Sequence, residues 1–180
     1  NLLAKFQGHK QGVTSAVFSP DSNQILTASY DRTARVWDTK GNLLAVFRGH
    51  EGYVYNAEFS PDGRQILTAS NDGTARLWDL SVARAAQRQN FQESDSKNNA
   101  QLAELREDKY GVDQAEFSPY GRYILTDSSY PSLTTRLWDT QGNLLTEFQV
   151  PKERLNNPKF SPDGRQILTI GDETTYLWDS

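Results

Sequence analysis

Two sets of polar residues in this chain have the side-chain types that could carry out hydrolysis. His9, Ser29 and Asp31 supply the base, nucleophile and orienting carboxylate of a hydrolase triad. The same three types return 41 positions later, at His50, Ser70 and Asp72. An active site is needed once, whereas structural residues recur with every copy of a repeated unit. The duplication therefore favours a structural role for both sets over catalysis.

The composition limits which binding or metal sites the chain can contain. The chain has no cysteine, a formal net charge of -4 and a pI near 5.2. This excludes disulfides and thiolate metal sites, and the acidic balance is unlike the basic surfaces that neutralise nucleic-acid phosphates. The sequence has no glycine-rich phosphate-binding motif with its lysine and no carboxylate cluster with metal-ligand spacing. We therefore expect a protein or peptide partner, and no nucleic acid, metal or cofactor.

The sequence also bears on where the protein resides. No apolar run approaches the roughly 18 residues that a membrane span needs, and the chain has no signal-like stretch and no N-x-[ST] acceptor. We expect a cytoplasmic protein that does not enter a membrane. Because the chain begins at Asn1 rather than at methionine, we also expect a processed product or a piece of a longer protein.

Two short motifs indicate that the whole chain is built from copies of one unit. Phe-Ser-Pro begins at Phe18, Phe59, Phe117 and Phe160, and Trp-Asp begins at Trp37, Trp78, Trp138 and Trp178. Within the four units, the phenylalanine and the tryptophan are 19, 19, 21 and 18 residues apart. Such a constant register indicates one structural unit copied with small insertions and deletions. Four repeats account for nearly all of the 180 residues.

Each unit has the pattern of short strands separated by turns. In the first unit, we expect strands at 13–18, 25–29, 33–37 and 43–47. Ser-Pro-Asp follows the first strand and Lys-Gly-Asn precedes the last, and these residue types form tight turns. A single four-stranded sheet with apolar residues on both faces cannot bury them, so the copies must stack face to face. Radial stacking gives an all-β propeller with four four-stranded blades in this chain.

Residues at fixed places in the units resemble the WD40 repeat. Gly8-His9, Asp31 and Trp37-Asp38 have the spacing typical of that family, and the second unit repeats them. The resemblance implies a WD40-type β-propeller in which a buried hydrogen-bond network ties each blade together. The implied members are His9, Ser29, Asp31 and Trp37 in blade one, and His50, Ser70, Asp72 and Trp78 in blade two. It also implies an interaction module, with an enzyme on a propeller fold as the less favoured alternative.

The repeats are interrupted once. We place the repeat boundaries at 1–41, 42–79, 102–140 and 141–180. Residues 80–101 are a polar insertion, for which we expect a loop with a helical turn at 83–88 or, alternatively, a partner-binding appendage. Asp108 and Pro151 stand where the histidine belongs, so blades three and four should lack the full network and be looser. Arginines recur two residues before the tryptophan, which indicates pairing between blades, at Arg35, Arg76 and Arg136.

The resemblance also predicts where a partner binds. It implies binding at the rim formed by the start of each first strand and the turn before the blade aspartate. The expected contact residues are Thr14, Tyr30, Tyr53, Tyr55, Asn71, Asp113, Arg154 and Asn156. Tyrosine and arginine are enriched where interfaces gain most of their affinity. We expect a scaffold that binds a protein or peptide, with a regulatory or sensor domain acting in cis within a larger signalling NTPase-type protein as the alternative.

The number of blades does not determine how the propeller ring is completed. WD40 propellers usually have about seven blades, and neither end of this array has a polar capping face. Leu2–Phe6 has the sequence of a fourth strand, and the chain ends at Trp178-Asp179, where a fourth strand should follow. That segment could therefore complete the last blade of a ring. The alternatives are a compact four-bladed ring, two chains forming an eight-bladed ring, or a fragment whose other blades lie elsewhere in a parent protein.

Overall fold

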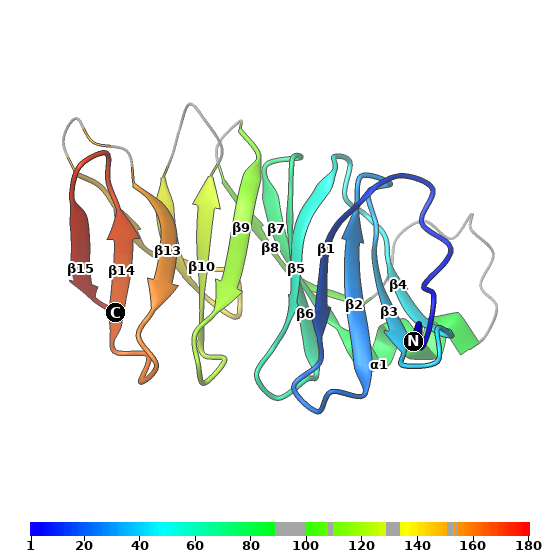
Figure 1. The fold of residues 1–180 in the computed structure, drawn as a ribbon. Coiled ribbons are helices and arrows are strands. Elements are labelled where there is room, and N and C mark those ends of the chain that lie inside the picture. The colour runs from blue at the N-terminus through cyan, green and yellow to red at the C-terminus, as the bar shows by residue number, and fades with distance from the viewer. Residues whose placement is uncertain (89–99, 108–109, 129–133, 151–152, 154) are drawn as a thin grey trace.

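The chain folds into a row of antiparallel sheets, each of which is one blade (Figure 1). The computed structural model describes residues 1–88, 100–107, 110–128, 134–150, 153 and 155–180. Blade one holds β1 (Val13–Phe18), β2 (Gln24–Ser29), β3 (Ala34–Asp38) and β4 (Leu43–Phe47) in that spatial order. Blade two holds β5 (Val54–Phe59), β6 (Gln65–Ser70), β7 (Thr74–Asp79) and β8 (Gln101–Arg106).

The second half of the chain repeats this arrangement. Blade three holds β9 (Val112–Phe117), β10 (Tyr123–Ser128), β11 (Thr135–Asp139) and β12 (Leu144–Phe148). Blade four holds β13 (Asn156–Phe160), β14 (Gln166–Ile170) and β15 (Thr175–Asp179), and these three strands are all that its sheet contains among the described residues. The expected all-β fold of WD40 type is thus confirmed, with a last blade that is one strand short.

Tight turns join the first two strands of every blade at the lower edge in Figure 1. In blade two, Ser60 N donates to Gln65 O at 3.0 Å, and Ser60 Oγ donates to Asp62 Oδ1 at 2.6 Å. Gly63 has a φ of 69°, a left-handed conformation that costs glycine little. The Ser-Pro-Asp-Gly sequence therefore fixes the hairpin register, in which Phe59 lies opposite Ile66.

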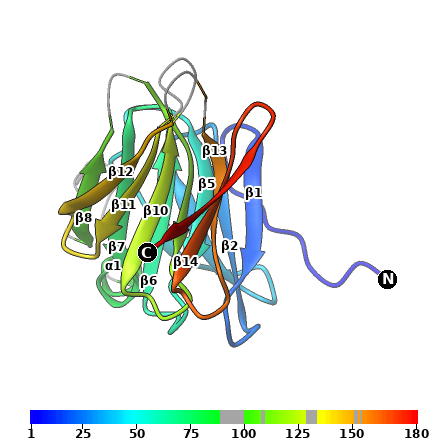
Figure 2. The ribbon, with the colours of Figure 1, turned by 90° about the vertical axis from the view of Figure 1, so that its left-hand side faces the viewer.

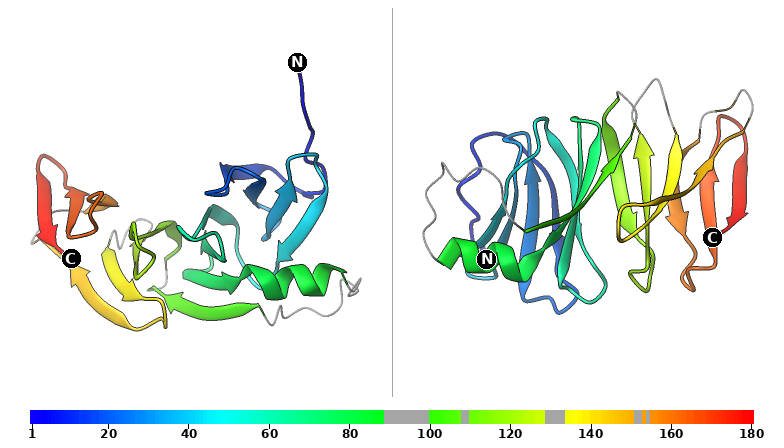
Figure 3. Two further views of the ribbon diagram at one scale, coloured as in Figure 1. Left: turned by 90° about the horizontal axis from the view of Figure 1, so that it is seen from below. Right: turned by 180° about the vertical axis from the view of Figure 1, so that it is seen from behind.

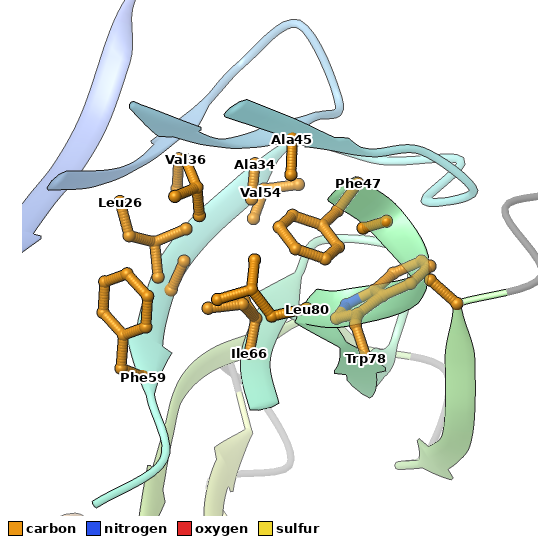
Figure 4. Packing of buried hydrophobic residues seen from close by; sticks show 14 residues of the cluster. Leu26, Ala34, Val36, Ala45, Phe47, Val54, Phe59, Ile66, Trp78 and Leu80 are labelled. Atoms are coloured by element: carbon orange, nitrogen blue, oxygen red, sulfur yellow. The ribbon is translucent and has the colours of Figure 1, made fainter. Parts of the chain in front are cut away.

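Neighbouring blades bury each other's faces in hydrophobic clusters. The first cluster, shown in Figure 4, includes Leu26, Val36, Ala45 and Phe47 of blade one and Val54, Phe59, Ile66 and Trp78 of blade two. Equivalent positions recur in the second cluster, where the apolar side chains are Leu67, Leu77, Leu105, Phe117, Ile124 and Trp138. Burying one large apolar side chain stabilises a protein by about 1.5–3 kcal/mol. The repeated apolar positions therefore hold each blade against the next.

The blades form an open arc, and its two end faces expose positions that are buried inside it (Figure 3). Phe18, on the free face of blade one, is 68% exposed, against 8% for Phe59 at the same place in blade two. Leu177, on the free face of blade four, is 62% exposed, whereas Leu77 in blade two is fully buried. The arrangement found is therefore not the compact four-bladed ring.

The N-terminal segment leaves the arc at the free side of blade one (Figure 2). Leu2–Phe6 pairs with no strand among the described residues, so it does not complete blade four within one chain. Phe6 packs edge-on against Trp37, with ring centroids 6.1 Å apart. Phe47 of β4 packs in a similar way against Trp78, at 5.8 Å. Phe6 thus occupies the position that a fourth strand of a preceding blade would give it.

The insertion begins with a helix rather than a loop. α1 (Leu80–Arg88) starts directly after β7 and extends beyond the single turn expected at 83–88. Asp79 Oδ1 accepts hydrogen bonds from Ser81 N at 2.7 Å and Val82 N at 3.1 Å, which caps the helix N-terminus. Leu80 and Ala83 are buried in the first cluster, so the helix packs on the blades. Residues 89–99 of the expected loop lie outside the described residues, and no helix in the described part is long and apolar enough to cross a membrane.

Candidate functional site

The polar residues singled out as a possible triad lie in a hydrogen-bond network inside each of the first two blades. In blade one, His9 Nδ1 lies 2.9 Å from Asp31 Oδ2, and His9 Nε2 lies 2.8 Å from Thr27 Oγ1. Trp37 Nε1 donates to Thr27 Oγ1 at 2.9 Å. Blade two repeats these three contacts within 0.1 Å, through His50, Asp72, Thr68 and Trp78.

The direction of these hydrogen bonds follows from the pKa values. Burial lowers the pKa of His9 below its usual value, although Asp31 acts in the opposite sense. Burial would raise the pKa of Asp31, but hydrogen bonds from Thr33, Lys10 N and His9 outweigh it and lower that pKa to about 2. At neutral pH, a neutral His9 therefore donates through Nδ1 to an ionised Asp31 and accepts the Thr27 hydroxyl proton at Nε2.

The serines stand apart from the histidines. Ser29 is fully buried, and its hydroxyl accepts from Asp31 N at 3.0 Å and donates to Gln11 O at 3.3 Å. Ser70 is likewise fully buried and accepts from Asp72 N at 3.2 Å. A triad needs its serine bonded to the histidine and open to substrate. Ser29 and Ser70 thus adjoin the networks through the aspartate backbone, and the hydroxyl between histidine and tryptophan belongs to a threonine.

Blade three builds a different network in the absence of a histidine. The buried Glu107 accepts hydrogen bonds from Thr126 Oγ1 and Arg136, and Trp138 Nε1 donates to Thr126 Oγ1 at 2.8 Å. One glutamate therefore takes the place of the histidine at the threonine. In blade four, Trp178 Nε1 donates to Thr169 Oγ1 at 2.9 Å. The tryptophan-threonine bond is thus present in all four blades.

The recurring arginine does not link blades as expected at Arg76. Its guanidinium lies 3.7 Å from Asp72 Oδ2 and 3.3 Å from Glu104 Oε2, and both carboxylates belong to blade two. Glu104 lies on β8, which runs beside β7 in the same sheet. The expectation of pairing between blades is therefore wrong for this residue, because the fourth strand of its own blade supplies the charge.

The rim candidates lie at the upper edge in Figure 1, where the first strands begin and the second strands end. Tyr30 and Tyr53 are 43% and 45% exposed, and their rings meet edge to face with centroids 5.1 Å apart. Tyr55 Oη donates to Asn71 Oδ1 at 2.8 Å. Burial, followed by the charge of Asp113, raises the pKa of Tyr55, so its hydroxyl keeps its proton. We call Tyr30, Tyr53, Tyr55 and Asn71 the tyrosine patch.

The backbone below holds this patch in place. Tyr30 N donates to Gly12 O at 3.0 Å, and Asn71 N donates to Tyr53 O at 2.9 Å. A Cβ added to Gly12 would lie 3.3 Å from the Tyr30 ring, so the glycine leaves the ring room to lie close over the chain. The patch therefore rests on paired strand ends rather than on long loops.

The other predicted contact residues are placed differently. Thr14 Oγ1 donates to Val54 O at 2.6 Å, which uses its hydroxyl to join blades one and two. Asp113 is exposed at the second residue of β9, whereas Asn156 is half-buried at the start of β13. Arg154 lies outside the described residues. The structure thus brings the four residues of the tyrosine patch together and leaves Thr14 in a structural contact.

The sequence contains two further signals for residues of these sites. Ile-Leu-Thr occurs in every repeat, ending at Thr27, Thr68, Thr126 and Thr169, and these are the threonines that accept from the tryptophans. Tyr110, which is 40% exposed just before β9, is a further aromatic residue near the upper rim. Among the described residues, no group of three or more histidines and carboxylates could hold a metal ion.

Comparisons with known proteins agree with this geometry. Residues 1–38 and 41–79 match the WD40 family model, described as WD domain, G-beta repeat. The chain is 27% identical over 181 residues to Pre-mRNA-processing factor 19 homolog 2 of Arabidopsis thaliana, a match that covers 99% of this chain and 32% of the relative. It is 50% identical over 36 residues to WD repeat and FYVE domain-containing protein 1 of Mus musculus, which covers 20% of this chain and 9% of the relative.

A third relative is the Target of rapamycin complex subunit LST8 of Saccharomyces cerevisiae. It is 42% identical over 40 residues, which is 22% of this chain and 13% of the relative. Each match thus covers less than a third of the relative's own length. Two repeats match the family model, and all the sheets follow the same blade pattern. Residues 1–38 and 41–79 are therefore WD40 repeats, and the sheets that follow resemble them.

Proposed function

We propose that the protein is a non-enzymatic scaffold that binds a protein or peptide through the tyrosine patch on its upper rim. The observation that carries the proposal is the pair Tyr30 and Tyr53, two exposed rings in edge-to-face contact on a fixed backbone. WD40 domains are generally non-catalytic interaction modules, and one relative is named as a subunit of a complex. The buried serines support the non-enzymatic part of the proposal, because neither can act as an exposed nucleophile.

The chemistry of the patch suits a protein surface. Tyrosine rings supply large apolar area with little loss of side-chain entropy, and their hydroxyls supply hydrogen bonds at the edge. Tyr30 and Tyr53 already lie against each other, so binding would order few additional torsions. The acidic balance of the chain disfavours nucleic acid as the occupant.

Alanine substitutions at the two rims test the proposal. The variant Tyr30→Ala/Tyr53→Ala should lose the proteins that co-purify with the wild-type chain from its own cells, as measured by quantitative mass spectrometry. Tyr120→Ala is the matched control, because Tyr120 is 71% exposed in the β9–β10 turn at the opposite edge. Equal recovery of every co-purifying protein with both variants would contradict the proposal.

We further propose that additional blades cover the two free faces of the arc. Phe18 and Leu177 are exposed at positions that are buried in the interior blades, and the curated relatives are longer than this chain. The cover would come from the remaining blades of a longer parent protein or from a second copy that completes an eight-bladed ring. Light scattering distinguishes the two: a species of twice 20.3 kDa supports the second copy, and a monomer with exposed apolar faces supports the parent protein.

Regulation in cis is the alternative function. A signalling NTPase domain in the same polypeptide would then replace the separate partner, and binding in trans would fall when that domain is joined to the blades. We also propose a cytoplasmic location, supported by the cysteine-free sequence. Fractionation of the source cells tests that location, and recovery from a secreted or membrane fraction would contradict it.

A further inference from the structure

A second candidate site lies on the lower rim, at the edge opposite the tyrosine patch (Figure 1). A pocket of about 600 Å³ opens between the β5–β6 turn and the first turn of α1. The turn contributes Asp62, Gly63 and Arg64 to its lining, and the helix side contributes Asp79, Ser81 and Arg84. The volume lies within the range of pockets that bind small groups, which is about 300–1,000 Å³.

The walls of this pocket are fixed to each other. Leu80 N donates to Arg64 O at 3.0 Å, which ties the start of the helix to the turn. Leu80 and Ala83 are each only 2% exposed and pack in the cluster between blades one and two. The pocket therefore depends on the insertion, because the corresponding connections in blades one and three are short turns without a helix.

Arg84, on the helix side of the pocket, has a hydrogen-bond donor without an acceptor among the described residues. Arg84 donates one hydrogen bond to the neutral side-chain oxygen of Gln24, and its buried Nε has no acceptor among the described residues. Arg88 lies close enough to repel it, and Asp21 supplies only a weaker opposing charge. Arg64, across the pocket, is 86% exposed and reaches Asp62 only at 4.0 Å. Within the part of the chain that the structure describes, Arg84 thus has no carboxylate partner, and Arg64 has only the long contact to Asp62.

The carboxylates nearby are already used within their own turns. Asp79 Oδ1 accepts from Ser81 Oγ, Ser81 N and Val82 N, so the free amides at the helix N-terminus are also occupied. Asp62 Oδ1 accepts from Ser60 Oγ and Arg64 N. These bonds use the Oδ1 atom of each carboxylate, and Asp62 Oδ2 lies 4.0 Å from Arg64 Nε. The donors left at the pocket are therefore those of the arginines.

We propose that this pocket binds the carboxylate of a glutamate or aspartate side chain on a partner peptide, held by Arg84 and Arg64. Arginine pairs with a carboxylate through two parallel N–H donors, which gives both affinity and orientation. Asp62 and Asp79 favour a singly charged group over a phosphate, whose charge of about -1.5 to -2 they would repel more strongly. This site is independent of the tyrosine patch, since it lies on the other rim and recognises charge.

A titration followed by nuclear magnetic resonance tests the proposal on the full chain. The probe is N-acetyl-glutamic acid α-amide, which carries one carboxylate, and the uncharged probe is N-acetyl-glutamine α-amide. The acid should shift the Arg84 Nε–H and Gly63 N–H resonances saturably, and the glutamine analogue should not. Arg84→Gln and the exposed Arg64→Gln should each weaken binding at least about tenfold, which corresponds to about 1.4 kcal/mol.

The chain contains its own control for this measurement. The turn 161–166 has the same sequence as the turn 60–65, but no helix follows it within the described residues. Equal shifts at Gly63 and Gly164 would show a general salt effect and overturn the proposal, as would equal binding of the glutamine analogue. Tighter binding of inorganic phosphate than of the acid would overturn the assignment to a carboxylate. Each variant keeps the amide spectrum of the blades, which separates loss of binding from loss of fold.

Discussion

Thr68→Val tests which hydroxyl completes the blade network. Thr68 is fully buried, and its hydroxyl lies 2.7 Å from His50 Nε2 and 2.9 Å from Trp78 Nε1. Valine keeps nearly the same shape but leaves both nitrogens buried without a partner. Each unsatisfied group costs about 1–3 kcal/mol, so the two together should lower the free energy of unfolding by about 2–6 kcal/mol. Urea unfolding followed by tryptophan fluorescence measures this loss.

A second substitution in the same blade makes the test selective. Ser70 bonds to Asp72 N at 3.2 Å and does not touch the histidine, so Ser70→Ala should cost only about 1 kcal/mol. Thr146→Val, on the exposed part of β12, should change stability by less than about 0.5 kcal/mol. A loss for Thr68→Val that is no larger than the loss for Ser70→Ala would refute the reasoning, because the serine would then matter as much as the bridging threonine.

Three further predictions concern buried charge and packing. Burial raises the pKa of Glu58 to about 8, so the free energy of unfolding should fall as pH rises from about 4.5 to 8. Glu58→Gln should raise that free energy by on the order of 2–4 kcal/mol at pH 8 and leave it unchanged at about pH 4.5, as measured by urea unfolding. Glu116→Gln is the control, because Glu116 occupies the same place in β9 but has Lys159 as a counter-ion, and a similar gain there would contradict the explanation. The pKa of Asp31 is lowered to about 2, so its contribution to stability is complete above the unfolded pKa near 3.8 and is lost as pH falls towards 2. Asp31→Asn should therefore make the melting temperature fall less steeply over that pH range. An unchanged slope would count against the network. Phe59→Ala should cost about 3–5 kcal/mol and Phe18→Ala less than about 1 kcal/mol, since only the former is buried between blades, and equal losses in calorimetry would argue against the open arc.

The blade pattern could be predicted because it is written in local, repeated signals. Alternation of apolar residues sets the strands, and Ser-Pro-Asp-Gly sets the turns at the same place in each copy. The sequence predicts only a helical turn at 83–88, because its polar Gln and Arg residues are typical of an exposed loop. The stability of the helix comes from the Asp79 cap and from burial of Leu80 and Ala83 against strands that are distant in sequence.

The site was predictable to a smaller extent. The resemblance to the WD40 repeat indicates the rim tyrosines, but their contact depends on the distance between blades one and two, which no local signal gives. The structural bond of Thr14 to Val54 O could not be predicted, because it crosses between blades. The role of Glu107 could not be predicted from the repeat pattern, because Glu107 stands one position before the place of the histidine and still reaches Thr126. Tertiary geometry, rather than residue type, decides each of these roles.

We propose above that partners bind the upper rim at the tyrosine patch. The most direct measurement places a photo-crosslinking amino acid at position 53 or, in a separate chain, at position 120, and irradiates the source cells. Both positions carry exposed tyrosines, so the substitution perturbs them equally. We predict a discrete crosslinked protein from position 53 that position 120 does not give. Crosslinks from position 120 alone would contradict the account and would move the partner surface to the lower rim.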